Sequence, residues 1–314
     1  MGTTYNIVIV DSDDSLDHSK LLNVVETTLK QVDGDYSNWN PTSEVSRFNA
    51  QLTTEPVPVS DGFRDMMVLA NHVHEETGGT FDLTLTPVID LWGFGPSGTV
   101  TKRPDAASLA AAMQTVGQDQ VVELSEDGEV LRKTTPNATV YLTALAKGYG
   151  IDKVAQSLSE QGANNFMVEI GGDLYVTGKT SRDSNWSIGI ERPDAILQSV
   201  EEVIEFSDAG MATSGDYRNY FEQDGVRYSH IIDGVSGQPI SHRTASVTVI
   251  ADTATEADAW ATALLAVGAE RGLEIAVQND LDALFIVRQN ANNENEFELI
   301  STPGFEKFRK PLKD

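Results

Sequence analysis

A carboxylate and a hydroxyl four residues apart are the two groups of this sequence best spaced to act together. Asp258 and Thr262 lie in the stretch 253–268, where Thr253 and Glu256 form a capping box that predicts the start of a helix. Residues four apart share one face of a helix, and such a pair suits Mg²⁺, which keeps waters and takes ligands from a phosphate. Spacing alone favours a simpler interpretation than a metal site. In it Asp258 is solvated and Thr262 bonds a carbonyl of its own helix, because polar pairs are common on helices.

Three further places carry residues that could bind or react. Lys147 and Gly148 stand at an expected strand-to-helix turn, which could seat a phosphate on exposed helix N–H groups, although the Walker spacing is absent. Gly171–Gly172 predicts a tight hairpin or a backbone nest for an anion. His230 precedes Asp233 at a strand end, an arrangement that favours acid–base chemistry over a purely structural histidine.

Hydrophobic periodicity and turn residues predict an α+β protein with two lobes and mixed sheets flanked by helices. The segment 36–49 has no clear period and is expected to be a loop, and the basic tail 307–313 is expected to be solvated. The expected helices are 15–32, 60–77, a short one after Asp105, one carrying Ile151 to Leu158, 253–268 and 270–278. The expected strands are 3–10, a hairpin within 120–133, 165–170, 173–177, 186–191, 200–206, one ending near Gly234, 244–251 and 282–287.

The charge balance restricts the possible ligands. The 314 residues include 22 basic and 48 acidic side chains, a net charge of −26. A field of this sign repels nucleic acid and anionic lipid, so an anionic ligand would need a metal ion or a local positive group. The absence of cysteine excludes disulfides and thiolate zinc sites. No apolar run approaches the roughly 20 residues of a membrane span.

Nine short motifs, in order and spread over nearly the whole chain, resemble those of the ApbE family, the FAD:protein FMN transferases. Each motif is weakly specific by itself, and the ordered set is highly specific. They are Met1-Gly-Thr, Ser43-Glu-x-x-Arg-Phe-Asn49, Gly79-Thr-Phe-Asp82, Leu91-Trp-Gly-Phe-Gly95, Ala146-Lys-Gly-Tyr149, Glu169-Ile-Gly-Gly-Asp173, Ala212-Thr-Ser-Gly-Asp-Tyr217, Ser229-His-Ile-Ile-Asp233 and Ala257-Asp-Ala-Trp-Ala-Thr262.

The resemblance implies one ApbE-type domain over residues 1–314, with FAD in a cleft between interleaved lobes. It implies Mg²⁺-dependent transfer of FMN from FAD, through its phosphate, to a Thr or Ser hydroxyl of a redox protein, with release of AMP. The implied Mg²⁺ ligands are Asp258, Thr262 and the backbone carbonyl of Ala144. The positions matching FAD contacts are Met1, Trp39, Thr80, Phe81, Asp82, Tyr141, Lys147 and Ile232.

Several alternatives stay open within this resemblance. The match at His230 suggests that it activates the acceptor hydroxyl, although Asp258 could also serve as the base. An FAD pyrophosphatase that releases FMN and AMP, or a flavin-binding protein with little turnover, would carry similar residues. The implied acceptors are subunits of the Na⁺-pumping NADH:quinone reductase or of Rnf-type complexes. The family is typically periplasmic and often lipid-anchored, and we expect the same here, with the export signal absent from this sequence.

The sequence departs from the family pattern at two positions. Tyr141 stands where the family usually has an Asp that contacts FAD, and a phenol cannot replace a carboxylate acceptor, although it could stack. This predicts weaker FAD binding than with Asp. Gly234 stands where proline is typical, which predicts a slightly looser turn after His230.

Overall fold

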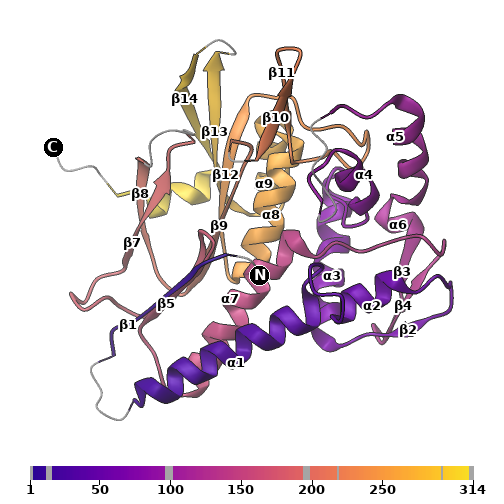
Figure 1. Cartoon of the computed structure of the whole chain (residues 1–314). Coiled ribbons are helices and arrows are strands. Elements are labelled where there is room, and N and C mark those ends of the chain that lie inside the picture. Colours follow the sequence, from indigo (N-terminus) through magenta and orange to yellow (C-terminus); the bar gives the residue numbers. More distant parts are fainter. Residues whose placement is uncertain are drawn as a thin grey trace.

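A computed structural model describes residues 3–11, 16–95, 102–193, 199–217, 219–290 and 293–310. Its centre is a seven-stranded sheet in which every neighbouring pair is antiparallel (Figure 1). The strands, in spatial order, are β1 (Tyr5–Ile9), β5 (Phe166–Ile170), β6 (Asp173–Thr177), β9 (Ala209–Gly215), β12 (Thr244–Ala251), β13 (Asp282–Asn290) and β14 (Asn293–Ser301).

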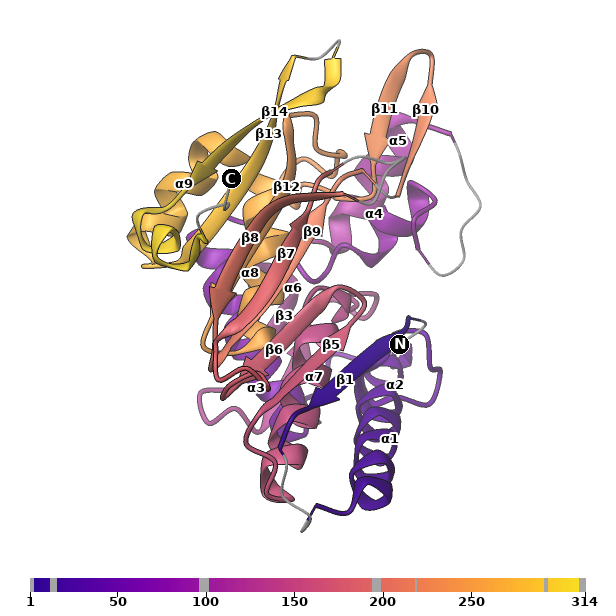
Figure 2. The same cartoon turned by 90° about the vertical axis from the view of Figure 1, so that its left-hand side faces the viewer.

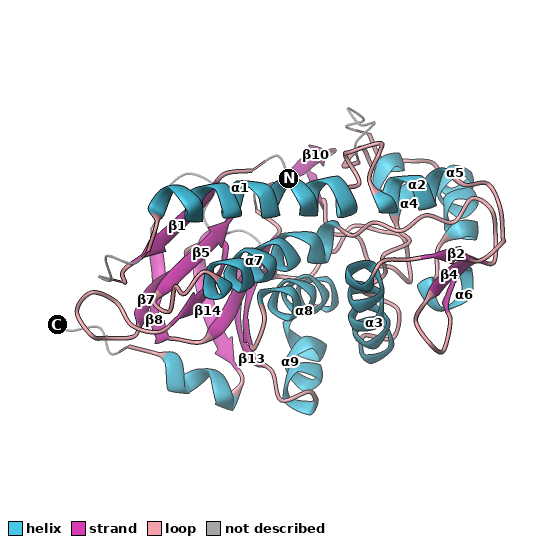
Figure 3. Cartoon of the chain, turned by 90° about the horizontal axis from the view of Figure 1, so that it is seen from below, coloured by secondary structure: helices cyan, strands magenta, loops and turns pink. Residues whose placement is uncertain are grey.

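Four helices lie along one face of this sheet (Figure 3). They are α1 (His18–Tyr36), α7 (Thr143–Glu160), α8 (Ala254–Val267) and α9 (Ala269–Gln278). Because side chains of a strand alternate between faces, Val247 and Val249 of β12 pack toward these helices, whereas Ile250 packs on the other side. The helix α8 has buried residues around most of its circumference, as expected of a helix enclosed by protein.

The opposite face of the sheet is covered by a two-stranded hairpin (Figure 2). Its strands are β7 (Trp186–Glu191) and β8 (Val200–Phe206). Trp186, Ile204 and Phe206 of the hairpin share one buried cluster with Met211 and Ile286 of the sheet. Burial of this apolar area fixes the hairpin against the sheet.

A mainly helical part lies beyond α7 and α8, on the side away from the sheet (Figures 1 and 3). Its helical elements are α2 (Glu44–Ala50), α3 (Asp61–Glu76), α4 (Thr86–Leu91), α5 (Ala106–Ala112), η1 (Met113–Thr115) and α6 (Gln118–Val121). Its strands are β2 (Val57–Pro58), β4 (Val130–Lys133) and β3 (Val122–Leu124), with a separate hairpin of β10 (Tyr220–Gln223) and β11 (Val226–Ser229). One apolar cluster joins residues of this part to α8 and to the sheet, so the two lobes share a core.

The expected α+β class is confirmed, and so are most of the elements. The expectation of mixed sheets is wrong, because all strand pairs among the described residues are antiparallel. Three differences have a local cause. Residues 44–50 form α2 rather than a loop, because the Ser43 hydroxyl accepts the N–H of Ser46 and caps a short helix. The helix α7 begins at Thr143, so Lys147 lies within the helix rather than at its mouth.

The third difference concerns the basic C-terminal segment. The described part of this segment is bonded to the hairpin and not simply solvated. Pro303–Phe308 form the 3₁₀ helix η2, and the backbone N–H of Lys310 then donates to Val203 at 3.1 Å. None of the described helices is both long and apolar enough to cross a bilayer.

Candidate active site

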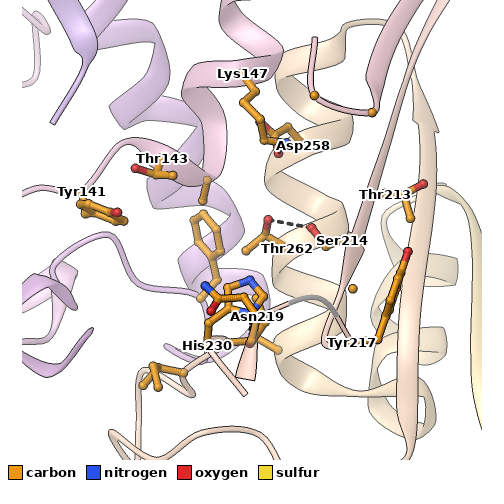
Figure 4. Close-up of a pocket in the computed structure, with 18 of the residues that line it drawn as sticks. Tyr141, Thr143, Lys147, Thr213, Ser214, Tyr217, Asn219, His230, Asp258 and Thr262 are labelled. Carbon is orange, nitrogen blue, oxygen red and sulfur yellow. Dashed lines mark hydrogen bonds and ion pairs between the residues drawn. The ribbon is translucent and has the colours of Figure 1, made fainter. Parts of the chain in front are cut away.

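A cavity of about 510 Å³ lies where the sheet, α7, α8 and the helical part meet (Figure 4). One wall comes from the segment Thr80–Leu83 and from Tyr141 and Thr143. The opposite wall comes from β7, β9 and the β5–β6 turn. In Figure 4 Tyr141 and Thr143 lie on one side, Thr213 and Tyr217 on the other, and Asp258 and Thr262 of α8 lie between them.

Lys147 joins two buried carboxylates at the inner end of the cavity. Its ammonium forms ion pairs with Asp173 Oδ2 and, at 3.3 Å, with Asp258 Oδ1. Asp258 Oδ2 accepts the backbone N–H of Gly148 at 3.1 Å. Burial raises the pKa of Asp258 to about 7 against the opposing charge of Lys147, with Asp173 adding to the increase. Burial lowers the pKa of Lys147, but the two carboxylates outweigh it and raise that pKa overall.

The position of α8 is fixed by close backbone contacts on both sides. Asp152 of α7 accepts the N–H groups of Ala254 at 2.8 Å and Thr255 at 2.9 Å, which caps the helix from outside its own sequence. A Cβ at Gly148 of α7 would lie 2.3 Å from the Ala254 carbonyl oxygen, and one at Gly210 of β9 would lie 2.3 Å from the Ala254 nitrogen. Only glycine permits these approaches.

The groups around Asp258 fit a Mg²⁺ ion. The Thr262 hydroxyl faces the same cavity and lies 3.0 Å from the Ser214 hydroxyl. Ala144 lines the cavity, and its carbonyl oxygen has two lone pairs, so it can accept a ligand bond; the Gly148 N–H that a regular helix would direct at it donates to Asp258. Asp173 lies on the same Lys147 ammonium, so two carboxylates share one cation at this point.

The ligand set is nevertheless small. Among the described residues there is no cluster of three or more His, Cys, Asp or Glu side chains suited to a metal. One carboxylate, one hydroxyl and one carbonyl therefore leave room for waters and phosphate oxygens, which is the usual way that proteins bind Mg²⁺. The interpretation of Asp258 as a solvated surface residue is wrong, because its side chain is only 3% exposed.

His230 lies at the opposite end of the cavity from Lys147 (Figure 4). Its Nδ1 is 2.9 Å from the backbone carbonyl of Asn219. A carbonyl can only accept, so Nδ1 carries the hydrogen and Nε2 keeps its lone pair. Burial lowers the pKa of His230, against the effects of the Asn219 carbonyl and of Asp216. The side chain is therefore neutral and basic at Nε2 at neutral pH.

The neighbouring Asp233 is not the partner of His230. Its carboxylate instead accepts the N–H of Val235 at 3.0 Å and the hydroxyl of Ser236 at 2.7 Å, so it stabilises the turn. The same turn is held to the facing wall, because Gly234 donates its N–H to the carbonyl of Thr80 at 2.9 Å. Proline could not make this bond, which stabilises the turn that Gly234 was expected to loosen.

Asp82 fixes the shape of the loop before α4. Its Oδ1 accepts the N–H of Thr84 at 2.6 Å and its Oδ2 accepts the N–H of Gln118 at 2.8 Å. Thr80, Phe81 and Asp82 all line the cavity. With both carboxylate oxygens engaged by the protein, Asp82 acts by holding this wall in place.

The remaining expected FAD contacts are distributed unevenly. Tyr141 and Ile232 line the cavity, as does Ala144. Trp39 is 59% exposed and is not among the lining residues, although the adjacent Asn38 holds the backbone of Leu142 at 2.8 Å. Met1 lies outside the described residues.

The glycine pair 171–172 forms the tight β5–β6 hairpin and is not an anion nest. Both residues have positive φ, and their N–H groups donate to the Thr4 carbonyl and to Glu169 Oε1. These donors are thereby used within the protein. The hairpin predicted from the sequence is confirmed, and it lines the cavity with backbone only.

Comparison with known proteins identifies the family. The ApbE family model matches residues 1–285. The chain belongs to the ApbE family. It is 41% identical to an FAD:protein FMN transferase of Vibrio cholerae over 288 residues. This match covers 92% of this chain and 85% of the relative. It is 38% identical to the protein of the same name from Haemophilus influenzae, over 98% of this chain and 89% of the relative.

The fold agrees with that of a solved family member. The structure of the flavin transferase ApbE from Vibrio cholerae superposes with a TM-score of 0.89 at 38% identity, covering 98% of this chain and 96% of that one. The architecture described above is therefore that of an ApbE protein. The match extends across both walls of the cavity, because it covers nearly the whole chain.

Asp173 is a residue of this ApbE site to which the sequence assigned no role. Its Oδ1 accepts the N–H of Thr213 at 3.0 Å while its Oδ2 pairs with Lys147, so it joins β9 to α7. In the sequence it stands at the end of the motif Glu169-Ile-Gly-Gly-Asp173, directly after the glycines that predict a turn. A carboxylate directly after a glycine hairpin at a sheet edge could have been considered as a partner for Lys147.

We expect Asp173→Asn to lower kcat/KM for flavin transfer by roughly 10- to 100-fold, because Lys147 loses one of the two charges that orient it. The amide oxygen can still accept the Thr213 N–H, which limits the structural change. Steady-state transfer and FAD titration measure the effect. Asp61→Asn is the matched control, since it also removes a carboxylate from an ion pair, with Arg64 on the surface. Equal activities of the two variants would contradict a role for Asp173 in orienting Lys147.

Proposed function

We propose that this ApbE protein transfers FMN from FAD to a Thr or Ser hydroxyl of an acceptor protein and releases AMP. The observation that carries the proposal is one cavity with Lys147 paired to the buried Asp258 at one end and a basic His230 Nε2 at the other. A phosphate-binding cation and a general base in a single cavity are what phosphoryl transfer to a hydroxyl requires.

The reaction balances with these groups. The acceptor oxygen forms a bond to the FMN phosphorus of FAD, and the bond from that phosphorus to the bridging pyrophosphate oxygen breaks. The hydroxyl proton moves to His230 Nε2, and AMP leaves with the bridging oxygen. A Thr or Ser hydroxyl is a weak nucleophile, so removal of its proton by a placed base accelerates the step.

Two positive groups offset the charge of the pyrophosphate. Lys147 extends from α7 into the cavity and is about one-third exposed there, so it can contact a phosphate oxygen. Asp258, Thr262 and the Ala144 carbonyl would hold Mg²⁺, which supplies Lewis-acid stabilisation of charge on the phosphate oxygens. In a protein with a net charge of −26 both are needed locally.

The geometry supports His230 rather than Asp258 as the base. Both oxygens of Asp258 are engaged, by Lys147 and by the Gly148 N–H, and its side chain is buried. His230 is half-buried and its Nε2 has no partner among the described residues. A general base needs a free lone pair within reach of the hydroxyl.

One assay separates transfer from the two alternatives. The protein is incubated with FAD, Mg²⁺ and a redox subunit that carries an acceptor Thr, and the products are analysed by mass spectrometry. A mass gain on the acceptor equal to FMN supports transfer. Free FMN and AMP without that gain would identify a pyrophosphatase, and unchanged FAD would identify a flavin-binding protein.

Family membership also supports an acceptor and a location. We propose subunits of the Na⁺-pumping NADH:quinone reductase or of Rnf-type complexes as acceptors, and a periplasmic site of action at the inner membrane. Flavinylation of each purified subunit in the assay above tests the first proposal. Fractionation of cells that produce the protein from its native gene tests the second.

We expect Tyr141→Asp to tighten FAD binding. Tyr141 lines the cavity beside the Thr80–Leu83 wall, and its backbone N–H is tied to Leu83 at 2.7 Å, so the side chain is held where a carboxylate could accept hydrogen bonds from FAD. A gain of about 10- to 100-fold in affinity corresponds to one charge-assisted bond. Fluorescence titration measures it, with Tyr141→Phe as the control that changes only the hydroxyl. No gain for the Asp variant would refute the expectation.

A further inference from the structure

The β7–β8 hairpin has one covered edge. The outer edge of β8 is covered by the C-terminal segment, in which Lys310 donates its N–H to Val203 at 3.1 Å and Arg309 forms a bridge with Ile204. Glu205 adds an ion pair with the side chain of Lys310. The edge of β7 on the other side has no strand paired to it among the described residues.

The alternation of hydrogen bonds along the hairpin shows which backbone N–H and C=O groups point to this open edge. The Val203 carbonyl points away from β7, because it accepts the Lys310 N–H. Val203 pairs with Gly189, so these two residues form a non-hydrogen-bonded pair of the antiparallel ladder. The N–H and C=O of Gly189 therefore both point to the open edge. Neither has a backbone partner outside the hairpin in the described parts of the chain.

This open edge borders the active-site cavity. Gly189, Ile190 and Glu191 line the cavity that contains His230 and Asp258. The wall that resembles the FAD site lies opposite, at Thr80–Asp82 and Tyr141. The β7 side of the cavity is thus left for the second substrate.

The strand is also suited to pairing with another chain. Its sequence from Trp186 to Glu191 has neither the lysine nor the proline that commonly protects an exposed edge. Trp186 and Ile190 are buried against the sheet, so the strand is held rigidly. The glycine exposes its backbone to an approaching chain without a side chain at that point.

Resting on the proposed transferase function, we propose that the acceptor protein binds as an extended segment that adds a strand to the open edge of β7. Backbone pairing at Gly189 then places the acceptor Thr or Ser side chain in the cavity. Main-chain hydrogen bonds supply affinity in this mode of recognition, and side chains at alternate positions supply specificity. Different acceptors could therefore bind with limited similarity outside the reacting residue.

The first test is Gly189→Pro, which removes the edge N–H without removing a ladder bond. The acceptor is a peptide with a single Thr that the wild-type protein flavinylates. We expect the KM for this peptide to rise at least tenfold, with kcat at saturating peptide changed much less. Far-UV circular dichroism and Tm establish that the variant is folded. An unchanged peptide KM in the folded variant would overturn the proposal, and so would a loss of FAD affinity as large as the change in KM.

The second test leaves the enzyme unchanged. A series of peptides, each N-methylated at one backbone amide around the acceptor Thr, is assayed with wild-type protein. Strand addition predicts losses at every second position, because only alternate N–H groups face β7. Uniform losses, or none, would contradict it. A wild-type protein that flavinylates neither peptide nor protein refutes the transferase function itself, and the docking proposal falls with it.

Discussion

Asp258→Asn is expected to reduce FMN transfer by about three orders of magnitude or more, because it removes the one carboxylate among the proposed Mg²⁺ ligands. Chelation of divalent cations should reduce the wild-type rate similarly, and added Mg²⁺ should restore it in the wild type only. Titration with Mn²⁺, followed by electron paramagnetic resonance, measures cation affinity independently of turnover.

Two controls make the Asp258 result interpretable. Thr262→Ser keeps the hydroxyl and should retain most of the activity and cation affinity. The Tm of Asp258→Asn should stay close to the wild-type value, since Lys147 keeps its pair with Asp173 and the amide can still accept the Gly148 N–H. Full transfer by the Asn variant, or transfer that survives chelation, would mean that the cation site is elsewhere or absent.

His230→Ala is expected to lower kcat by two to four orders of magnitude, the usual contribution of a general base, with a smaller effect on FAD affinity. The pH dependence gives a second readout. Because burial lowers the pKa of His230, its loss of a proton should make the wild-type rate rise with pH through a value below the ordinary 6.5. The rate of the His230→Ala variant should not show this rise at acidic pH (the acidic limb of the pH profile), and added imidazole should restore part of the rate.

His18→Ala is the matched control for this experiment, since His18 is an exposed residue at the start of α1. It should show the wild-type pH profile. An acidic limb that persists in His230→Ala would assign it to another group. In that case Asp258 would have to be reconsidered as the base, although both its oxygens are engaged.

The helices and strands could be predicted largely because their signals are local. The Thr253 hydroxyl accepts the N–H of Glu256 as the capping box requires, and Gly268 ends the helix. The hairpin at Gly171–Gly172 follows from residues that tolerate positive φ. The prediction of a loop at 44–50 failed because the helix there is too short to show a hydrophobic period. A single capping side chain, that of Ser43, determines where it begins.

The site itself could be predicted only through the resemblance to a family. Spacing placed Asp258 and Thr262 on one helix face but favoured a solvated pair, because their burial depends on α7 and β9, more than 40 residues away in sequence. The partner of His230 is a backbone carbonyl, which any residue at position 219 would supply. A backbone partner cannot be recognised from residue type. The sequence therefore indicated Asp233 as the partner of His230, which is wrong.

The glycines on either side of Ala254 determine which part of the cavity can move. Sliding of α8 along the sheet would drive its first turn into the backbone at Gly148 or Gly210, where there is no space for even a methyl group. The carboxylate of Asp258 is therefore stationary with respect to the sheet. FAD that enters the cavity therefore meets a carboxylate whose position is fixed by the backbone on both sides of α8.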